Sequence, residues 1–113
     1  MTIFRIQYEK LYKGQEYYWG LEPASFLDDL LSVVNKKESE LSVLDIGCGE
    51  GKDAVYMAQK GCKVTAFDLT ETGVKKTKLF LNCLRIGIKK IKCGRRGICL
   101  SILKIGKFTI LMK

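Results

Sequence analysis

The stretch VLDIGCGEG, residues 43–51, decides the fold of this 113-residue chain. Its apolar first half predicts a strand over 41–46, and three glycines at alternate positions predict a tight turn directly after that strand. Residues 54–60 then have helical periodicity, Gly61 suits a left-handed helix C-cap, and the β-rich stretch 62–67 predicts a second strand. Strand, turn, helix and strand in this order predict a βαβ unit with parallel strands and a right-handed crossover.

Helices are predicted on both sides of this unit along the chain. Apolar residues recur at helical spacing over 24–36, after Pro23, which suits the first turn of a helix. Weaker patterns predict helices over 6–13 and 71–84, the second with Thr70 as its N-cap. The fold class expected from these elements is α/β: a Rossmann-like parallel sheet with flanking helices.

The pattern becomes less regular after residue 84. Three apolar segments, 86–93, 98–105 and 108–112, are candidate strands, with 94–97 as a turn between the first two. We expect a single domain, since dividing 113 residues would leave each half too little buried surface to fold.

The glycine turn opens at the carboxyl edge of the predicted sheet, where ligands bind in doubly wound folds. Gly47, Gly49 and Gly51 lack a Cβ, so the backbone can approach a ligand closely. Asp68 ends the next strand and is placed to accept hydrogen bonds from ribose hydroxyls at a solvent-facing pocket mouth. Asp45 either holds the turn through backbone N–H groups or contacts a cationic ligand group. The alternatives are a ligand-free connection and an exposed loop carboxylate, but the order of these features favours a nucleotide-type pocket.

The spacing of the glycines discriminates among ligands. It is G-x-G-x-G, whereas dinucleotide enzymes use G-x-G-x-x-G and phosphate loops use G-x-x-x-x-G-K-[ST]. Residues 43–51, with Asp68 closing the second strand, resemble the cofactor motif of class I S-adenosylmethionine-dependent methyltransferases. Residues 18–20 and 52–55 are similar to the tellurite-resistance methyltransferase subgroup. The resemblance covers roughly residues 8–78.

The resemblance implies S-adenosyl-L-methionine as the cofactor. Gly47, Cys48 and Gly49 would then line its methionine end, Asp68 would bind the ribose, and Leu69 would flank the adenine. The full set of predicted cofactor-binding residues is Trp19, Asp45, Gly47, Cys48, Gly49, Gly51, Asp68 and Leu69. The implied activity is methyl transfer to a small-molecule or oxyanion acceptor.

An aromatic run, Tyr17-Tyr18-Trp19, precedes the glycine motif. It either covers the methyl-donor end of the cofactor or packs the first helix against the sheet. Cys48 is expected to be a small buried residue and not a nucleophile, since no activating base is at hand. Methyl transfer depends mainly on proximity and orientation, so no catalytic residue is assigned.

Composition excludes several classes of protein. The chain has no histidine, which rules out Ser-His-Asp and Cys-His mechanisms and makes a metal site unexpected. Five cysteines without a C-x-x-C pair are expected to be reduced thiols. Neither a signal peptide nor an apolar run long enough for a membrane span is present in the sequence, so a cytoplasmic protein is expected.

Charge divides the chain in two. Residues 1–71 contain eight bases and twelve acids, for a net charge of −4, whereas residues 72–113 contain twelve bases and no acid. We therefore expect a partial methyltransferase domain, with a cofactor-binding half at 1–78 and a basic tail unlike the family at 79–113. A truncated or frame-shifted gene would explain the tail and would leave the sheet incomplete at its C-terminal side, with an open edge and an uncovered face. The alternatives are an inactive remnant and a nucleic-acid-binding tail, and the second is not favoured.

Overall fold

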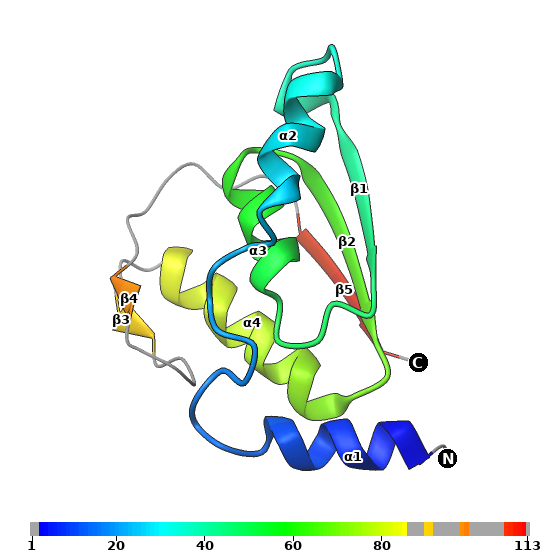
Figure 1. Ribbon diagram of the computed structural model, residues 1–113, viewed down its shortest axis with the longest axis vertical. Helices are drawn as coiled ribbons and strands as arrows, with labels where there is room; N and C mark the ends of the chain where they lie inside the picture. The colour runs from blue at the N-terminus through cyan, green and yellow to red at the C-terminus, as the bar shows by residue number, and fades with distance from the viewer. Residues whose placement is uncertain (1–2, 86–89, 92–97, 100–107, 113) are drawn as a thin grey trace.

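A three-stranded parallel sheet forms the centre of the fold (Figure 1). Strands β1 (Ser42–Ile46), β2 (Lys63–Asp68) and β5 (Phe108–Met112) pair in the order β1-β2-β5. The residues described by this computed structural model are 3–85, 90–91, 98–99 and 108–112. Within them, β1 pairs with β2 alone, so its other edge is open.

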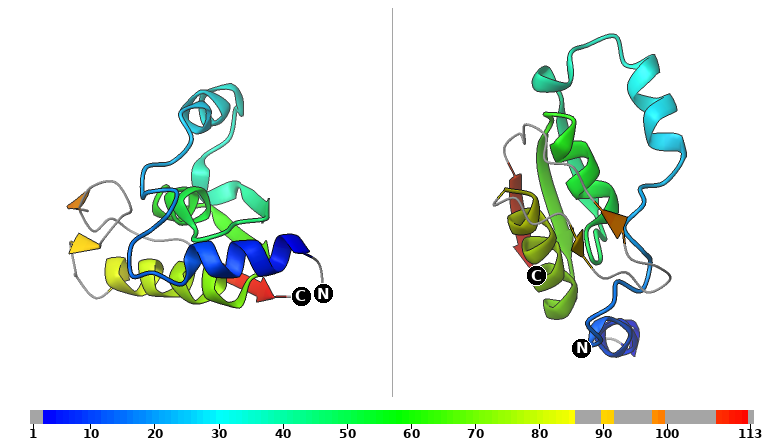
Figure 2. Two further views of the ribbon diagram at one scale, coloured as in Figure 1. Left: turned by 60° about the horizontal axis from the view of Figure 1, so that its bottom comes forward. Right: turned by 90° about the vertical axis from the view of Figure 1, so that its left-hand side faces the viewer.

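Three helices cover one face of the sheet, and a fourth lies across its end (Figure 1). Helices α2 (Phe26–Val33), α3 (Lys52–Gln59) and α4 (Glu71–Arg85) all lie on the same side of the strands. Helix α1 (Ile3–Tyr12) lies beside the carboxyl ends of β1 and β2 and packs along α4 (Figure 2). A short 3₁₀ helix (Glu38–Glu40) leads into β1. The fold is therefore an α/β fold in which α1 can close the end of the sheet where ligands bind.

The core lies between the sheet and α3. Helix α3 directs its apolar residues to two buried clusters, one on the sheet and one under α4. The first cluster contains Leu27, Cys48, Ala54, Met57, Ala58, Cys62, Val64 and Ala66. The second contains Tyr17, Leu21, Val55, Phe80, Leu81, Cys83 and Leu84. Because α3 contributes to both clusters, the glycine turn that begins it is held rigidly against the core.

The opposite face of the sheet is bare in the described part of the chain. Leu44 and Ile46 of β1 are 63% and 72% exposed, while Val43 and Asp45, which point the other way, are half-buried. Strand β2 also alternates, with Val64, Ala66 and Asp68 buried and the residues between them more accessible. The expected open edge and uncovered face are therefore present among the residues described.

The predicted elements are confirmed, with shifts of a few residues at their ends. Gly61 has φ +100° and lies where the helix C-cap was predicted. Of the candidate C-terminal strands, 108–112 forms β5, while Lys90–Ile91 (β3) and Ile98–Cys99 (β4) form a short antiparallel pair. The predicted turn at 94–97 lies outside the described residues.

Thr70 directly precedes α4 and occupies the predicted N-cap position, where its carbonyl accepts a hydrogen bond from the N–H of Val74 at 3.1 Å. The hydroxyl of Thr70 donates its hydrogen bond to the carboxylate of Asp68. In the first turn of α4, Glu9 of α1 accepts hydrogen bonds from the N–H (3.3 Å) and the hydroxyl (2.8 Å) of Thr72. Helix α1 is thus tied to the start of α4 by a contact that no local pattern could predict.

None of the helices in the described ranges is both long enough and apolar enough to cross a membrane.

Candidate functional site

The glycine turn takes the tight conformation that its sequence predicts. Gly47, Gly49 and Gly51 have φ of +77°, +56° and +95°, in the region that side chains rarely adopt. The N–H groups of Gly47 and Cys48 donate to the carbonyl of Phe67 on β2, at 2.7 and 2.9 Å. The turn is therefore fastened to the end of the neighbouring strand.

Asp68 fastens the next residue of the turn. Its Oδ1 accepts a hydrogen bond from the N–H of Gly49 at 3.1 Å, and its Oδ2 accepts one from the N–H of Thr70 at 3.0 Å. The side chain is buried, with 9% of the residue exposed, so the expected position at a solvent-facing mouth is wrong. The role of holding the turn, which the sequence left open for Asp45, belongs to Asp68.

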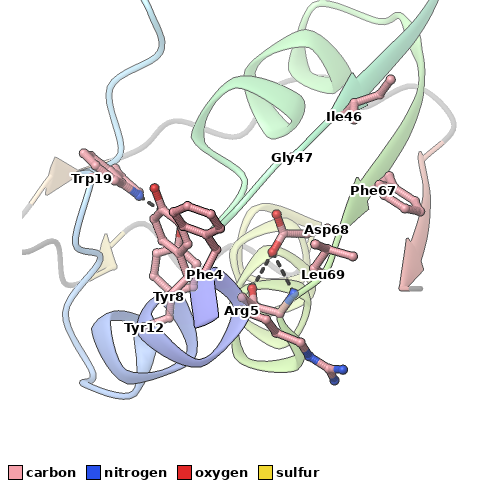
Figure 3. Close-up of a pocket in the computed structure, with 11 residues that line it drawn as sticks. Phe4, Arg5, Tyr8, Tyr12, Trp19, Ile46, Gly47, Phe67, Asp68 and Leu69 are labelled. Atoms are coloured by element: carbon pink, nitrogen blue, oxygen red, sulfur yellow. Dashed lines mark hydrogen bonds between the residues drawn. The ribbon is translucent and has the colours of Figure 1, made fainter. Parts of the chain in front are cut away.

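Two adjoining cavities lie at the carboxyl ends of β1 and β2. The larger has a volume of about 580 Å³ and lies between the side chains of α1 and the end of β2 (Figure 3). It is lined by Phe4, Arg5, Tyr8, Tyr12, Trp19, Ile46, Gly47, Phe67, Asp68, Leu69 and Thr70. The smaller, about 210 Å³, follows the glycine turn and is lined by Tyr12, Trp19, Gly20, Asp45 and residues 47–53. Tyr12, Trp19 and Gly47 line both cavities, so the two meet at these residues.

All eight predicted cofactor-binding residues line one or both cavities. Asp68 and Leu69 line the larger, and Trp19 and Gly47 line both. Asp45, Cys48, Gly49 and Gly51 line the smaller. The structure therefore brings together residues spread over fifty positions of sequence, because the carboxyl ends of parallel strands meet at one edge. That they bind a cofactor stays a prediction.

The three residues of the aromatic run have different places. Tyr17 is buried, packs edge-on against Phe80 of α4 and donates its hydroxyl to the carbonyl of Lys76 at 2.8 Å. Tyr18 is half-exposed and packs on Trp19, outside both cavities. Trp19 lines both cavities, and its indole N–H donates to the hydroxyl of Tyr12 at 3.0 Å (Figure 3). One aromatic residue of the run thus faces the site, and Tyr17 belongs to the core.

Sequence reasoning missed a buried ion pair under the glycine turn. The Nζ of Lys76, on α4, lies 2.7 Å from Oε2 of Glu50, and both side chains are less than a tenth exposed. Lys76 also donates to the carbonyl of Glu16 at 2.6 Å, while Glu50 accepts from the N–H of Trp19 at 3.3 Å. The pair therefore ties the segment before α2 to the turn. Helical spacing could have indicated that residue 76 faces inward, but nothing in the sequence identifies its partner.

Helix α4 also supports the turn through two small residues. The hydroxyl of Thr77 lies within hydrogen-bonding distance of two carbonyl oxygens, those of Gly49 (3.0 Å) and Gly73 (2.9 Å), and can donate to either. A Cβ on Gly73 would lie 2.7 Å from the carbonyl oxygen of Gly49, and one on Gly51 would lie 2.7 Å from Thr77. Glycine is therefore needed at 51 and 73 because backbone and helix approach closely there.

Burial sets the protonation of the groups around the smaller cavity. It raises the pKa of the Cys48 thiol to about 12, and the charge of Asp68 adds to this effect, so Cys48 is a buried thiol and not a nucleophile. Burial also raises the pKa of the Asp45 carboxyl above its ordinary value, and the charge of Asp53 raises it further. The pKa of Tyr12 rises to about 12, again mainly through burial, so its phenol keeps its proton.

The charged residues that line the smaller cavity fit a cationic group of a ligand better than they fit a phosphate. The acidic residues Asp45, Glu50 and Asp53 line it. Glu50 is paired with Lys76, and Asp53 is paired with Lys52 at 3.1 Å. Asp45 is therefore the one of the three that has no ion-pair partner among the described residues. S-adenosyl-L-methionine carries an ammonium, a sulfonium and one carboxylate, and no phosphate, so its two cationic groups fit a cavity that Asp45 lines. The larger cavity offers apolar side chains for an adenine and Asp68 for a ribose.

Comparison with known proteins agrees with this geometry. A family model described as "Methyltransferase domain" matches residues 18–97. No curated protein matches the chain significantly. The fold is similar to a solved structure described as "Conversion of a Disulfide Bond into a Thioacetal Group during Echinomycin Biosynthesis", with a TM-score of 0.60 and 21% identity. That match covers 98% of this chain and 38% of the other, so this chain spans well under half the length of that protein. The chain therefore belongs to the methyltransferase domain family and has the Rossmann-like α/β fold of class I methyltransferases.

Proposed function

We propose that this chain binds S-adenosyl-L-methionine across the two joined cavities and that its activity is methyl transfer. One observation carries the proposal: the glycine turn of β1 and the carboxylate that ends β2 lie in one continuous site beneath α1. Membership of the methyltransferase domain family supports it. So does Asp45 in the smaller cavity, whose carboxylate would attract a cationic group of the ligand.

Each part of the site has a role in this proposal. Leu69, 44% exposed at the cavity wall, gives the adenine an apolar surface. Asp68 receives the ribose hydroxyls, because a carboxylate has about four acceptor sites and protein groups occupy only some of them. Asp45 faces the ligand's ammonium in the smaller cavity. The glycine turn brings its backbone close to the methionine part.

The bound cofactor would supply an electrophilic methyl group on its sulfonium. The residues of this chain then contribute position and exclusion of water, which is the main source of rate in such a transfer. Helix α1 provides one wall of the larger cavity through Phe4, Tyr8 and Tyr12, and Glu9 anchors that wall to α4. No side chain of the described residues is proposed as a base.

We propose a small molecule or an oxyanion as the methyl acceptor. The support is the likeness of residues 18–20 and 52–55 to the tellurite-resistance subgroup. Release of S-adenosylhomocysteine, measured with tellurite, selenite or a small thiol as acceptor, tests this class. An inactive remnant would bind cofactor without releasing product under any of these conditions.

Calorimetric titration of the full chain with S-adenosylhomocysteine tests the cofactor proposal. We expect binding, and none of comparable affinity for ADP, because the carboxylate of Asp45 in the smaller cavity would repel a phosphate. Leu69→Asp, at the cavity wall, is expected to abolish binding. Leu79→Asp is the matched control: Leu79 is 54% exposed on α4 and lines neither cavity. Failure of the parent chain to bind, while folded, would overturn the proposal.

A further inference from the structure

Two aromatic side chains form the boundary between the larger and the smaller cavity. Tyr12, from the last turn of α1, and Trp19, from the segment before α2, line both. They are joined by the hydrogen bond from the indole N–H of Trp19 to the hydroxyl of Tyr12. Figure 3 shows the aromatic side chains of α1 and Trp19 on one side of the site, with Asp68 and Leu69 on the other.

The pair is held in a fixed position. Tyr12 is 4% exposed, its ring packs against that of Tyr8 at a centroid distance of 5.8 Å, and its hydroxyl lies over the glycine turn, 3.0 Å from where a Cβ of Gly49 would be. The backbone N–H of Trp19 donates to the buried Glu50. Trp19 is thus hydrogen-bonded to the turn, and Tyr12 is held by its hydrogen bond to Trp19 and by its packing. The spacing of the pair from a bound ligand is therefore set before the ligand arrives.

The charges near the pair also favour a cation. Asp45 lines the smaller cavity, and Asp68 lines the larger, together with Arg5. Glu50 and Asp53 also line the smaller cavity, but they are paired with Lys76 and Lys52. Aromatic faces attract cations through their quadrupole, and the attraction is stronger where water is excluded. A cation at the junction would therefore meet the aromatic side chains and the field of the carboxylates of Asp45 and Asp68.

We infer that Tyr12 and Trp19 form the part of the site that holds the sulfonium of the methyl donor. This rests on the proposed function, because an adenosyl group in the larger cavity and a methionine group in the smaller one place the connecting sulfur at their junction. The two residues are positioning residues, which distinguish the charged methyl donor from its neutral thioether product. Release of the spent cofactor would be favoured by the loss of this interaction.

The test compares the dissociation constants of S-adenosylmethionine and S-adenosylhomocysteine, which differ by the methyl group and its charge. In Trp19→Leu we expect the first constant to rise about 5- to 30-fold and the second to change less than about threefold. Tyr18→Leu is the matched control, since Tyr18 is 46% exposed, as Trp19 is 49% exposed, yet lines neither cavity. Tyr12→Phe keeps the ring and is expected to keep the ratio of the two constants.

The outcomes separate this inference from the proposed function. If the parent binds both ligands and Trp19→Leu weakens them equally, the sulfonium assignment is wrong while the cofactor site stands. The sulfonium assignment would also be wrong if Tyr18→Leu changed the ratio of the two dissociation constants as much as Trp19→Leu does. If the folded parent binds neither ligand, both proposals fail. Because Trp19 is half-exposed, its replacement is expected to leave the chain folded, which circular dichroism would verify.

Discussion

The carboxylate of Asp68 and the backbone N–H of Gly49 are joined by a 3.1 Å hydrogen bond across the ends of two neighbouring parallel strands. The residue predicted to receive a ribose therefore also holds the glycine turn in place. Its other oxygen accepts from Thr70, so the carboxylate links the turn, the end of β2 and the start of α4. Binding and folding are expected to depend on the same side chain.

Asp68→Asn should lower the stability of the chain as well as its affinity for S-adenosylhomocysteine. Each carboxylate oxygen accepts a hydrogen bond from a backbone N–H group. In the Asn variant, the side-chain NH₂ must face one of these two N–H groups, which then loses its acceptor. Asp68→Ala leaves both donors without this acceptor. We expect each variant to lose about 1–3 kcal/mol in the free energy of unfolding, measured by urea denaturation without ligand. Stability equal to that of the parent would contradict this role.

Replacing Lys76 should be among the most destabilising changes on α4. Lys76→Met leaves the carboxylate of Glu50, 2% exposed, buried without its ammonium partner at 2.7 Å. Loss of one partner of such a pair costs about 3–5 kcal/mol, and denaturant unfolding would measure it. The turn should loosen too, because Glu50 belongs to it.

Lys75→Met is the matched control for this change. Lys75 precedes Lys76 in the same helix and forms an ion pair with Glu71 at 3.0 Å. The side chains of Lys75 and Glu71 are both more than half exposed. An exposed pair of this kind contributes less than about 1 kcal/mol. If Lys75→Met and Lys76→Met lost the same free energy of unfolding, burial of the Glu50–Lys76 pair would have no special role in stability.

Local features of the sequence predict the fold, whereas contacts between distant segments of the chain are not predicted. The βαβ unit could be predicted because strand alternation, glycine spacing and helical periodicity are local properties of the chain. Seven of the eight predicted site residues lie at the ends of β1 and β2, and they could be predicted to lie together because the carboxyl ends of parallel strands meet. Trp19 lies before α2, and its prediction came from the aromatic run and the resemblance of residues 18–20. The hydrogen bond from Gly49 to Asp68 joins two strand ends that the βαβ unit brings together, but the sequence does not decide whether Asp45 or Asp68 accepts it. The pair Glu50–Lys76 spans 26 residues and depends on how α4 packs, which no local pattern encodes. Tyr12 was missed for the same reason: its role depends on where α1 lies.

Gly73→Ala should destabilise the chain although alanine is the better helix former. Helix propensity alone would favour alanine by about 1 kcal/mol. A Cβ at position 73 would, however, lie 2.7 Å from the carbonyl oxygen of Gly49 and closer still to the hydroxyl of Thr70. We expect a net loss of about 1–3 kcal/mol, since the turn must move to make room. Gly14→Ala, where the nearest atom is 4.0 Å away, should be nearly neutral in the same urea titration.

The thiol of Cys48 should react slowly over the whole range from pH 7 to 10. Burial raises its pKa from an ordinary 9.0 to about 12, so at pH 8 the folded chain holds about a thousandfold less thiolate than the unfolded chain. Because the folded pKa is raised, the stability that this shift contributes is present below pH 9 and is lost as pH rises through about 12. Mass spectrometry of the Cys48 peptide after iodoacetamide treatment, with urea-unfolded chain as reference, measures the difference. A plateau of the folded rate near pH 9 would contradict the shift.

The bare face of the sheet should make the parent chain self-associate, and one lysine on that face should reduce the association. Leu44 is 63% exposed on β1, whose second edge is open in the described residues, and apolar surface of this kind promotes contact between copies. Leu44→Lys is expected to change the free energy of unfolding by less than about 0.5 kcal/mol while lowering the weight-average mass in sedimentation equilibrium. Val43→Lys is the contrasting variant, because Val43 points to the core on the other face and its replacement should unfold the chain. If Leu44→Lys associates as strongly as the parent, the exposed face of β1 is not the surface through which copies meet.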